Sequence, residues 1–124
     1  MKKQYLFLSN LTTIEYIRNA MKRVRKKNSA VLLASQNIDD FLAPDVREYT
    51  KPLFAIPANR FLFYPGHVEQ RDFCDALSIS PAEYALIDHP ERGVCLYHCG
   101  NARYLLQVQA LDFQVKLFGD AGGR

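Results

Sequence analysis

The residues best placed to do chemistry are Ser35, Gln36 and Asn37, which follow the continuous apolar run Ala30–Ala34. A run of this length, entered from a basic helix end and left through polar residues, is typical of a central strand in a parallel sheet, buried on both faces. Ligands of such sheets bind at the carboxyl ends of the strands. We therefore expect these three side chains to face a nucleotide or substrate, and the amide of Gln36 can both donate and accept a hydrogen bond.

The element that leads into this strand is a basic helix. Apolar residues at three- and four-residue spacing predict a helix from about Thr13 to Lys27, and Thr12 and Glu15 have the spacing of a capping box. On a helix its cations point to two sides of the apolar stripe. They are Arg18, Lys22 and Arg25 on one flank, with Arg23 and Lys27 roughly opposite. They fit a solvated face that complements the helix dipole, or a contact with DNA phosphates.

Composition is that of an ordinary globular chain. The 124 residues predict one domain, with 48% hydrophobic and 23% charged residues. A net charge of +3 is too small to indicate nucleic-acid binding by itself. No apolar stretch approaches the length of a membrane span, and three cysteines without framework spacing predict free thiols in the cytosol.

Local patterns predict the remaining elements. They are helices at Val46–Lys51, Val68–Leu77 and Pro81–Asp88, a strand at Arg60–Tyr64, and a hairpin of Val94–Cys99 with Ala102–Ala110. The alternating Phe113, Val115 and Leu117 predict an edge strand or a segment that lies across a partner subunit. In the hairpin, alternation predicts Tyr104, Leu106 and Val108 inward. Asp39 and Asp40 suit a helix start. We predict no metal site, since Cys95 and Cys99 share one strand face and His98 lies on the other.

The order and spacing of several segments resemble the conjugative-transfer (type IV secretion) ATPase family, the VirB- and TraE-type motors with a RecA-like domain. The segments are Ile14–Asn28, Val31–Asn37, Asp40–Leu42, Lys51–Phe54, Arg60–Phe63, Arg92-Gly93 and Gly100. They extend over nearly the whole chain. The resemblance implies an α/β fold: part of a RecA-like P-loop NTPase domain, a mostly parallel sheet with flanking helices and a C-terminal antiparallel hairpin.

The resemblance also implies a function for the intact protein. It would bind ATP and Mg²⁺ and hydrolyse ATP to power DNA or protein transfer. Its partners would be other subunits of the same ATPase and the secretion or conjugation machinery at the inner face of the cytoplasmic membrane. Residues 1–124 would be the C-terminal portion of the ATPase domain, with a flexible tail at 119–124.

Site roles follow from the same resemblance. Gln36 would sense the γ-phosphate or orient the attacking water, with Ser35 and Asn37 in support. Either Arg23 or Arg25 would act in trans on the nucleotide of a neighbouring subunit. The alternative for Gln36 is a cap of the loop that follows.

Two family motifs are missing from the sequence. Glycine occurs only at positions 66, 93, 100, 119, 122 and 123, and none begins a phosphate-binding loop of the G-x-x-x-x-G-K-[ST] type. The family's acidic pair would precede Gln4–Leu8, where the chain has only Met1-Lys2-Lys3. We therefore expect a C-terminal fragment that binds no cofactor and hydrolyses no ATP alone, and whose exposed sheet edge favours self-association.

Two other readings stay open. The first is a non-enzymatic DNA- or partner-binding module of a mobile element that uses the basic helix Arg18–Lys27. The second is a structural remnant of such an element, without activity of its own.

Overall fold

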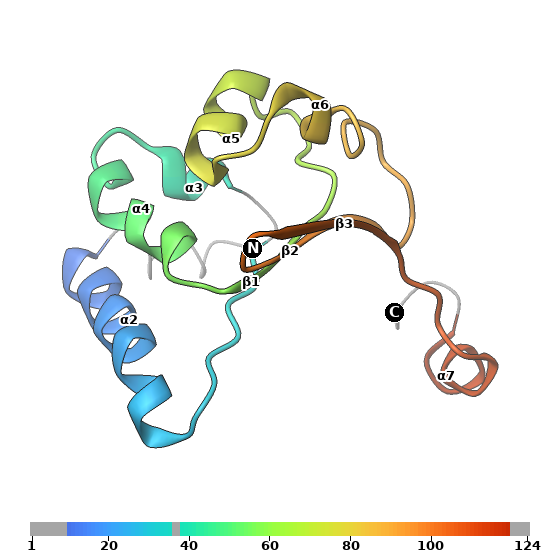
Figure 1. The fold of residues 1–124 in the computed structure, drawn as a ribbon, viewed down its shortest axis with the longest axis horizontal. Helices are drawn as coiled ribbons and strands as arrows, with labels where there is room; N and C mark the ends of the chain where they lie inside the picture. Colours follow the sequence, from blue (N-terminus) through green and yellow to red (C-terminus); the bar gives the residue numbers. More distant parts are fainter. Residues whose placement is uncertain (1–9, 36–37, 120–124) are drawn as a thin grey trace.

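The computed structural model describes residues 10–35 and 38–119, apart from the side chains of Arg25 and Asp40. The elements are α2 (Leu11–Val24), η1 (Arg25–Lys27), α3 (Asp39–Leu42), α4 (Arg47–Ala55), β1 (Asn59–Leu62), α5 (Gln70–Leu77), α6 (Pro81–Tyr84), β2 (Val94–Cys99), β3 (Ala102–Gln107) and α7 (Asp112–Phe118). Figure 1 shows α5 and α6 on one side of the sheet, α2 to α4 grouped beside it, and α7 at the far end.

The described strands form one antiparallel sheet in the order β1-β2-β3. In β1, Leu62 pairs with Leu96 of β2. The predicted hairpin is confirmed as β2 and β3, with Cys99 opposite Ala102 across the turn. The α/β class is therefore confirmed. The mostly parallel sheet is not: no pair of strands in residues 10–35 and 38–119 is parallel.

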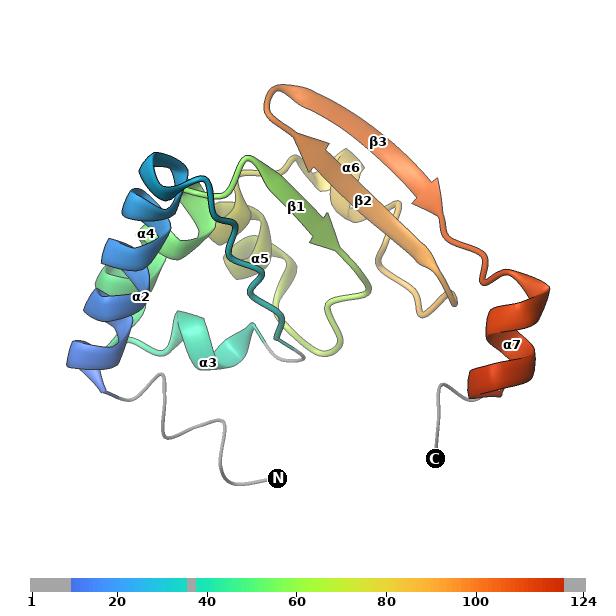
Figure 2. The same ribbon diagram turned by 90° about the horizontal axis from the view of Figure 1, so that it is seen from below.

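The predicted central strand is wrong for this structure. The part of the segment that the structure describes, residues 29–35, forms no strand, and Val31, Leu32 and Leu33 are 43%, 91% and 48% exposed. A strand buried on both faces needs hydrogen-bonded neighbours and a covering layer on each side. None of the described strands pairs with this segment, and its apolar side chains stay exposed; Figure 2 shows it leading from η1 toward the sheet.

Two apolar clusters hold the elements together. The larger one joins α5 and the segments around α6 to the sheet. Its buried members are Phe73, Cys74, Leu77, Ile79, Ile87 and Leu96. The smaller one packs α2 against α4 through Ile14, Val46 and Leu53. Each fully buried side chain of this size contributes about 1.5–3 kcal/mol, so these clusters fix the helices on one face of the sheet and at its side.

Helix starts depend on short side-chain bonds. The backbone N–H of Thr12 donates to Oδ1 of Asn10 (2.9 Å), so Asn10 caps α2, two residues before the predicted cap at Thr12. The second predicted box is confirmed: the N–H of Ser80 donates to Oε2 of Glu83 (2.7 Å), and the N–H of Glu83 donates to Oγ of Ser80 (3.2 Å). The helix α6 ends at Tyr84, however, before the predicted Asp88.

The predicted inner side of the hairpin is only partly correct, since of its three residues only Leu106 is half-buried, opposite the fully buried Cys95. Tyr104 and Val108 are 52% and 57% exposed, whereas His98 is 1% exposed. In the register His98 lies opposite Arg103, so these residues share the face that α5 and α6 cover. Both faces of β2 therefore carry buried residues, and the alternation of β3 alone does not decide which of its side chains are covered.

The C-terminal apolar residues form a helix rather than an edge strand. The N–H of Leu111 donates to Oε1 of Gln114 (2.9 Å), and the N–H of Gly119 donates to the carbonyl of Val115 (2.8 Å). These bonds close both ends of α7. Local capping therefore overrides the two-residue alternation of Phe113, Val115 and Leu117.

Gly93 lies just before β2, where its backbone closely approaches that of Val108, and this contact can be tested by substitution. Its φ is +77°, and a Cβ at this position would lie 2.2 Å from the carbonyl oxygen of Val108. We expect Gly93→Ala to lower the free energy of unfolding by roughly 2–4 kcal/mol, measured by urea denaturation, because it adds a backbone clash to left-handed strain. Gly66→Ala is the control, with φ +76° but no atom within 4 Å. Equal losses in the two variants would contradict this account.

Candidate functional site

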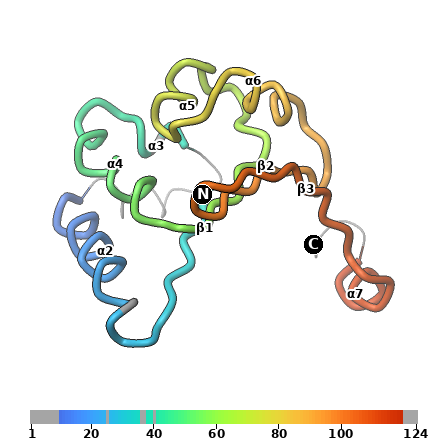
Figure 3. The backbone as a smooth tube through the Cα atoms, viewed as in Figure 1, coloured from blue at the N-terminus to red at the C-terminus, as the bar shows by residue number. Residues whose placement is uncertain are grey.

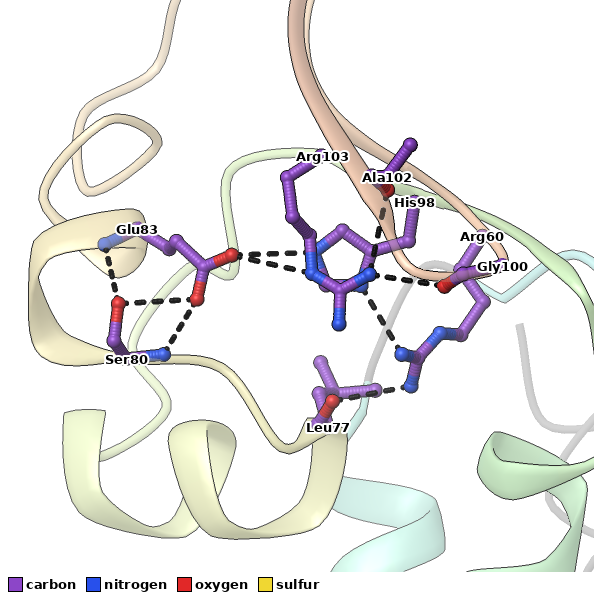
Figure 4. Close-up of polar contacts among 8 residues, drawn as sticks. All are labelled: Arg60, Leu77, Ser80, Glu83, His98, Gly100, Ala102 and Arg103. Carbon is purple, nitrogen blue, oxygen red and sulfur yellow. Dashed lines mark hydrogen bonds and ion pairs between the residues drawn. The ribbon is translucent and has the colours of Figure 1, made fainter.

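A buried polar cluster joins the sheet to the helices, and Arg60 of β1 lies at its centre. One guanidinium nitrogen, Nη1, donates to the carbonyls of Leu77 (3.1 Å) and Phe54 (3.2 Å). The other, Nη2, lies 3.1 Å from Nδ1 of His98. Arg60 thus connects β1 to the end of α5, to α4 and to β2, as the close-up in Figure 4 shows for Leu77 and His98.

The geometry fixes the state of His98. A guanidinium has only donors, so Nδ1 of His98 accepts and the ring proton is on Nε2. Nε2 makes no hydrogen bond within the described residues, and Oε1 of Glu83 lies 3.8 Å away. Burial lowers the pKa of His98, the charges of Arg103 and Arg60 lower it further, and Glu83 opposes them. His98 is therefore neutral at pH 7.

Glu83 completes the cluster from the helix side. It accepts from the backbone and hydroxyl of Ser80, and its Oε1 lies 3.4 Å from Nε of Arg103. The bonds from Ser80 are the main cause of a lowered pKa at Glu83, with His98 and Arg103 adding to it. Every charged member of the cluster has a partner in it, and the hydroxyl of Ser80 is engaged with Glu83 in the capping box. Its chemistry is that of a structural joint.

The predicted site residues are only partly placed. Gln36 and Asn37 lie outside the described residues, and so does the side chain of Arg25. Arg23 is exposed in the last turn of α2, and Ser35 is exposed at the end of the segment that leads away from η1. Because Gln36, Asn37 and the Arg25 side chain lie outside the described residues, the predicted nucleotide site stays a prediction.

One cavity of about 220 Å³ lies beside the cluster, between α4, β1 and α5. It is lined by three cationic side chains, which are Arg47, Lys51 and Arg60, and by the carboxylate of Asp75. Lys51 donates to Glu48 (2.6 Å), and Nη1 of Arg60 already serves two carbonyls. Because Lys51 and Arg60 already donate to these groups, Arg47 is the main donor in the cavity that could bind an anion.

The cysteines do not form a site. All three are free, and burial raises the pKa of the Cys74 and Cys95 thiols, which keeps both protonated. Within residues 10–35 and 38–119 no group of three His, Cys, Asp or Glu side chains could hold a metal ion. None of the helices in that part of the chain is long and apolar enough to cross a membrane.

Sequence reasoning missed the cluster because its partners are distant in the chain. Arg60 and His98 are 38 residues apart. The one local signal was the capping box, which placed Glu83 correctly. A second signal was a histidine between apolar residues of a predicted strand. In the sequence analysis His98 was considered only as a possible metal ligand, and not as a hydrogen-bond acceptor for a buried cation.

The cluster predicts a pH dependence of stability. Because the pKa of His98 is lower in the folded chain than in the unfolded chain, the unfolded chain binds a proton first as the pH falls. The contribution of His98 to the free energy of unfolding is therefore complete above a pH of about 6.5, the ordinary pKa of histidine, and decreases below it. His98→Gln keeps an acceptor for Arg60 but does not titrate. Urea denaturation from pH 7.5 to 5 should show a smaller loss in this variant than in the unaltered chain. Parallel losses would mean that His98 does not control this transition.

The fold of the described residues is similar to part of a known solved structure. No protein-family model and no curated protein matches the sequence. Among solved structures, the chain is similar to VirB4 of Thermoanaerobacter pseudethanolicus, with a TM-score of 0.77 and 29% sequence identity. The similarity covers 86% of this chain but only 28% of that chain. The fold thus matches part of VirB4 and supports the resemblance to the type IV secretion ATPase family.

Proposed function

We propose that this chain forms the C-terminal part of the ATPase domain of a type IV secretion or conjugation motor. The observation that carries the proposal is the similarity to VirB4 over 86% of the chain. The intact motor would bind ATP and Mg²⁺ and use hydrolysis to drive DNA or protein transfer at the cytoplasmic face of the membrane. The chain alone lacks the phosphate-binding loop and acidic pair in its sequence, so it would not hydrolyse ATP.

The exposed apolar segment supports this proposal. Val31, Leu32 and Leu33 form a strand-like sequence that nothing in the described structure buries. Exposed apolar surface of this size costs free energy in water. In the motor, neighbouring strands would cover it and make it an interior strand. Gln36 would then stand at a nucleotide pocket, with Ser35 and Asn37 beside it.

The arginine that acts in trans would come from the end of α2. Arg23 is exposed and makes no ion pair within the described part of the chain, so it is available to a neighbouring subunit. Arg25 follows in η1. A group of this kind stabilises the charge that develops on the transferred phosphoryl group. The motor would therefore work as a homo-oligomer.

A chimera tests the motor assignment. This chain replaces the matching segment of VirB4 from Thermoanaerobacter pseudethanolicus, and ATP turnover is measured with Mg²⁺. We expect hydrolysis by the chimera and none by the chain alone. In the chimera, Gln36→Ala and either Arg23→Ala or Arg25→Ala should reduce kcat, the arginine variant by about 10³-fold or more.

Lys26→Ala, in the same basic segment, is the matched control and should leave kcat unchanged. A chimera that folds but hydrolyses no ATP would contradict the motor assignment. Hydrolysis unaffected by all three substitutions would contradict the site residues alone. Magnesium-dependent turnover by the isolated chain would contradict the fragment interpretation.

A second candidate function is DNA binding by the basic end of α2 and η1. The supporting observation is that Lys22, Arg23, Lys26 and Lys27 are all exposed and make no ion pair within the described residues. Cations on one end of a helix can neutralise successive phosphates and release counterions. Such a module would need no nucleotide.

Salt dependence of binding to a labelled DNA duplex tests this candidate. We expect the logarithm of the association constant to fall linearly with the logarithm of salt concentration. Combined Lys22→Ala, Arg23→Ala and Lys26→Ala should reduce the slope by about 3. Removing the same charge elsewhere, with Lys51→Ala, Arg71→Ala and Lys116→Ala, is the control. Equal effects of the two triple variants would argue against a dedicated surface.

A further inference from the structure

The helix α7 has no core to pack against in the described structure. It is only seven residues long and has no buried residue. Phe113, Leu117 and Phe118 are 58%, 72% and 67% exposed. Asp112 and Lys116 share one polar strip, whereas Gln114 lies on the other side, where its amide oxygen accepts from the N–H of Leu111. A helix of two turns is not stable in water by itself. It therefore needs an apolar surface to lie on.

The side of the sheet away from α5 and α6 carries a half-exposed aromatic surface, which we name the aromatic row. It consists of Phe61, Tyr97 and Tyr104, which lie opposite one another on β1, β2 and β3. Phe61 and Tyr104 are each 52% exposed. Figure 2 looks onto the side of the sheet away from α5 and α6, which lie behind it. The row is on this open side, since its neighbour Leu96 on β2 points into the core with α5.

The geometry of the row decides what it can bind. Its ring centroids are 4.5 Å and 6.0 Å apart, with interplanar angles of 13° and 26°, so the rings stack on one another. The inner ring faces are already covered, and the row is a poor platform for nucleic-acid bases, which need free ring faces. The hydroxyl of Tyr97 donates to Oδ1 of Asn59 (2.7 Å). An apolar partner can therefore cover the ring edges without leaving this hydroxyl unpaired.

We propose that α7 of one copy of the chain covers the aromatic row of a second copy, and that the contact is reciprocal. Each copy carries both halves of the contact, as a twofold dimer requires. The hairpin's hydrogen bonds end at Val108, whose N–H donates to the carbonyl of Gly93 (2.8 Å), and only residues 109–111 separate it from α7. Figures 1 and 3 show α7 projecting away from its own sheet. This exchange does not depend on the ATPase proposal.

Light scattering coupled to size exclusion, over a dilution series of the full chain, tests the dimer. We expect a dimer that dissociates on dilution. Leu117→Asp on α7 and Tyr104→Asp in the row should each weaken self-association about tenfold or more, since each puts a charge into the contact. Lys116→Ser, on the polar strip of α7, is the control and should not change it. Circular dichroism checks that each variant keeps its fold.

Mixing the two charged variants separates the exchange from other modes of association. A Leu117→Asp chain keeps its row and a Tyr104→Asp chain keeps its helix, so one of the two contacts can form between them. We expect the mixture to form a mixed dimer at concentrations where each variant alone is monomeric. A monomeric unaltered chain, a dimer insensitive to Leu117→Asp, or a mixture that stays monomeric would each overturn the proposal.

Discussion

The guanidinium of Arg60 is the interaction on which the rest of the fold depends. It satisfies the carbonyls of Phe54 and Leu77, which belong to the C-terminal turns of α4 and α5. Carbonyls in a helix's last turn have no partner within the helix, and a cation there also complements the dipole. Because Arg60 also bonds to His98, it fixes β1 and β2 relative to both helices. Desolvation lowers the pKa of Arg60, but the group stays charged.

Features set by neighbouring residues could be predicted from the sequence. The capping box of Ser80 and Glu83 lies within one helical turn, and the hairpin turn at Gly100 needs only two strands that follow each other. Residues 31–35 are different, since an apolar run becomes a strand only when other strands pair with it. The alternation of β3 likewise left open which face is inner, and the positions of α5 and α6 decide that.

The candidate site could be predicted only as residue types. The three polar residues that follow an apolar run indicated Gln36 as a candidate. Its proposed role requires a nucleotide pocket whose other residues the described part of the chain does not include. The polar cluster was missed for a different reason: its members lie far apart in the sequence, and no local pattern pairs Arg60 with His98. Arg60 and His98 become partners only because antiparallel pairing places them opposite each other. Sequence patterns report short-range order, and this contact joins distant segments.

Alternation along β2 links the fixed part of the molecule to its open surface. His98 points to the helices and is held by Arg60, while the preceding residue, Tyr97, points to the other side and stacks between Phe61 and Tyr104. Successive residues of one strand thus serve the polar cluster and the aromatic row. Since the cluster fixes the strands, the row is held in place before any partner arrives, and a preorganised surface loses less entropy on binding. The aromatic row is therefore an apolar surface whose rings are already positioned by the strands and by their own stacking.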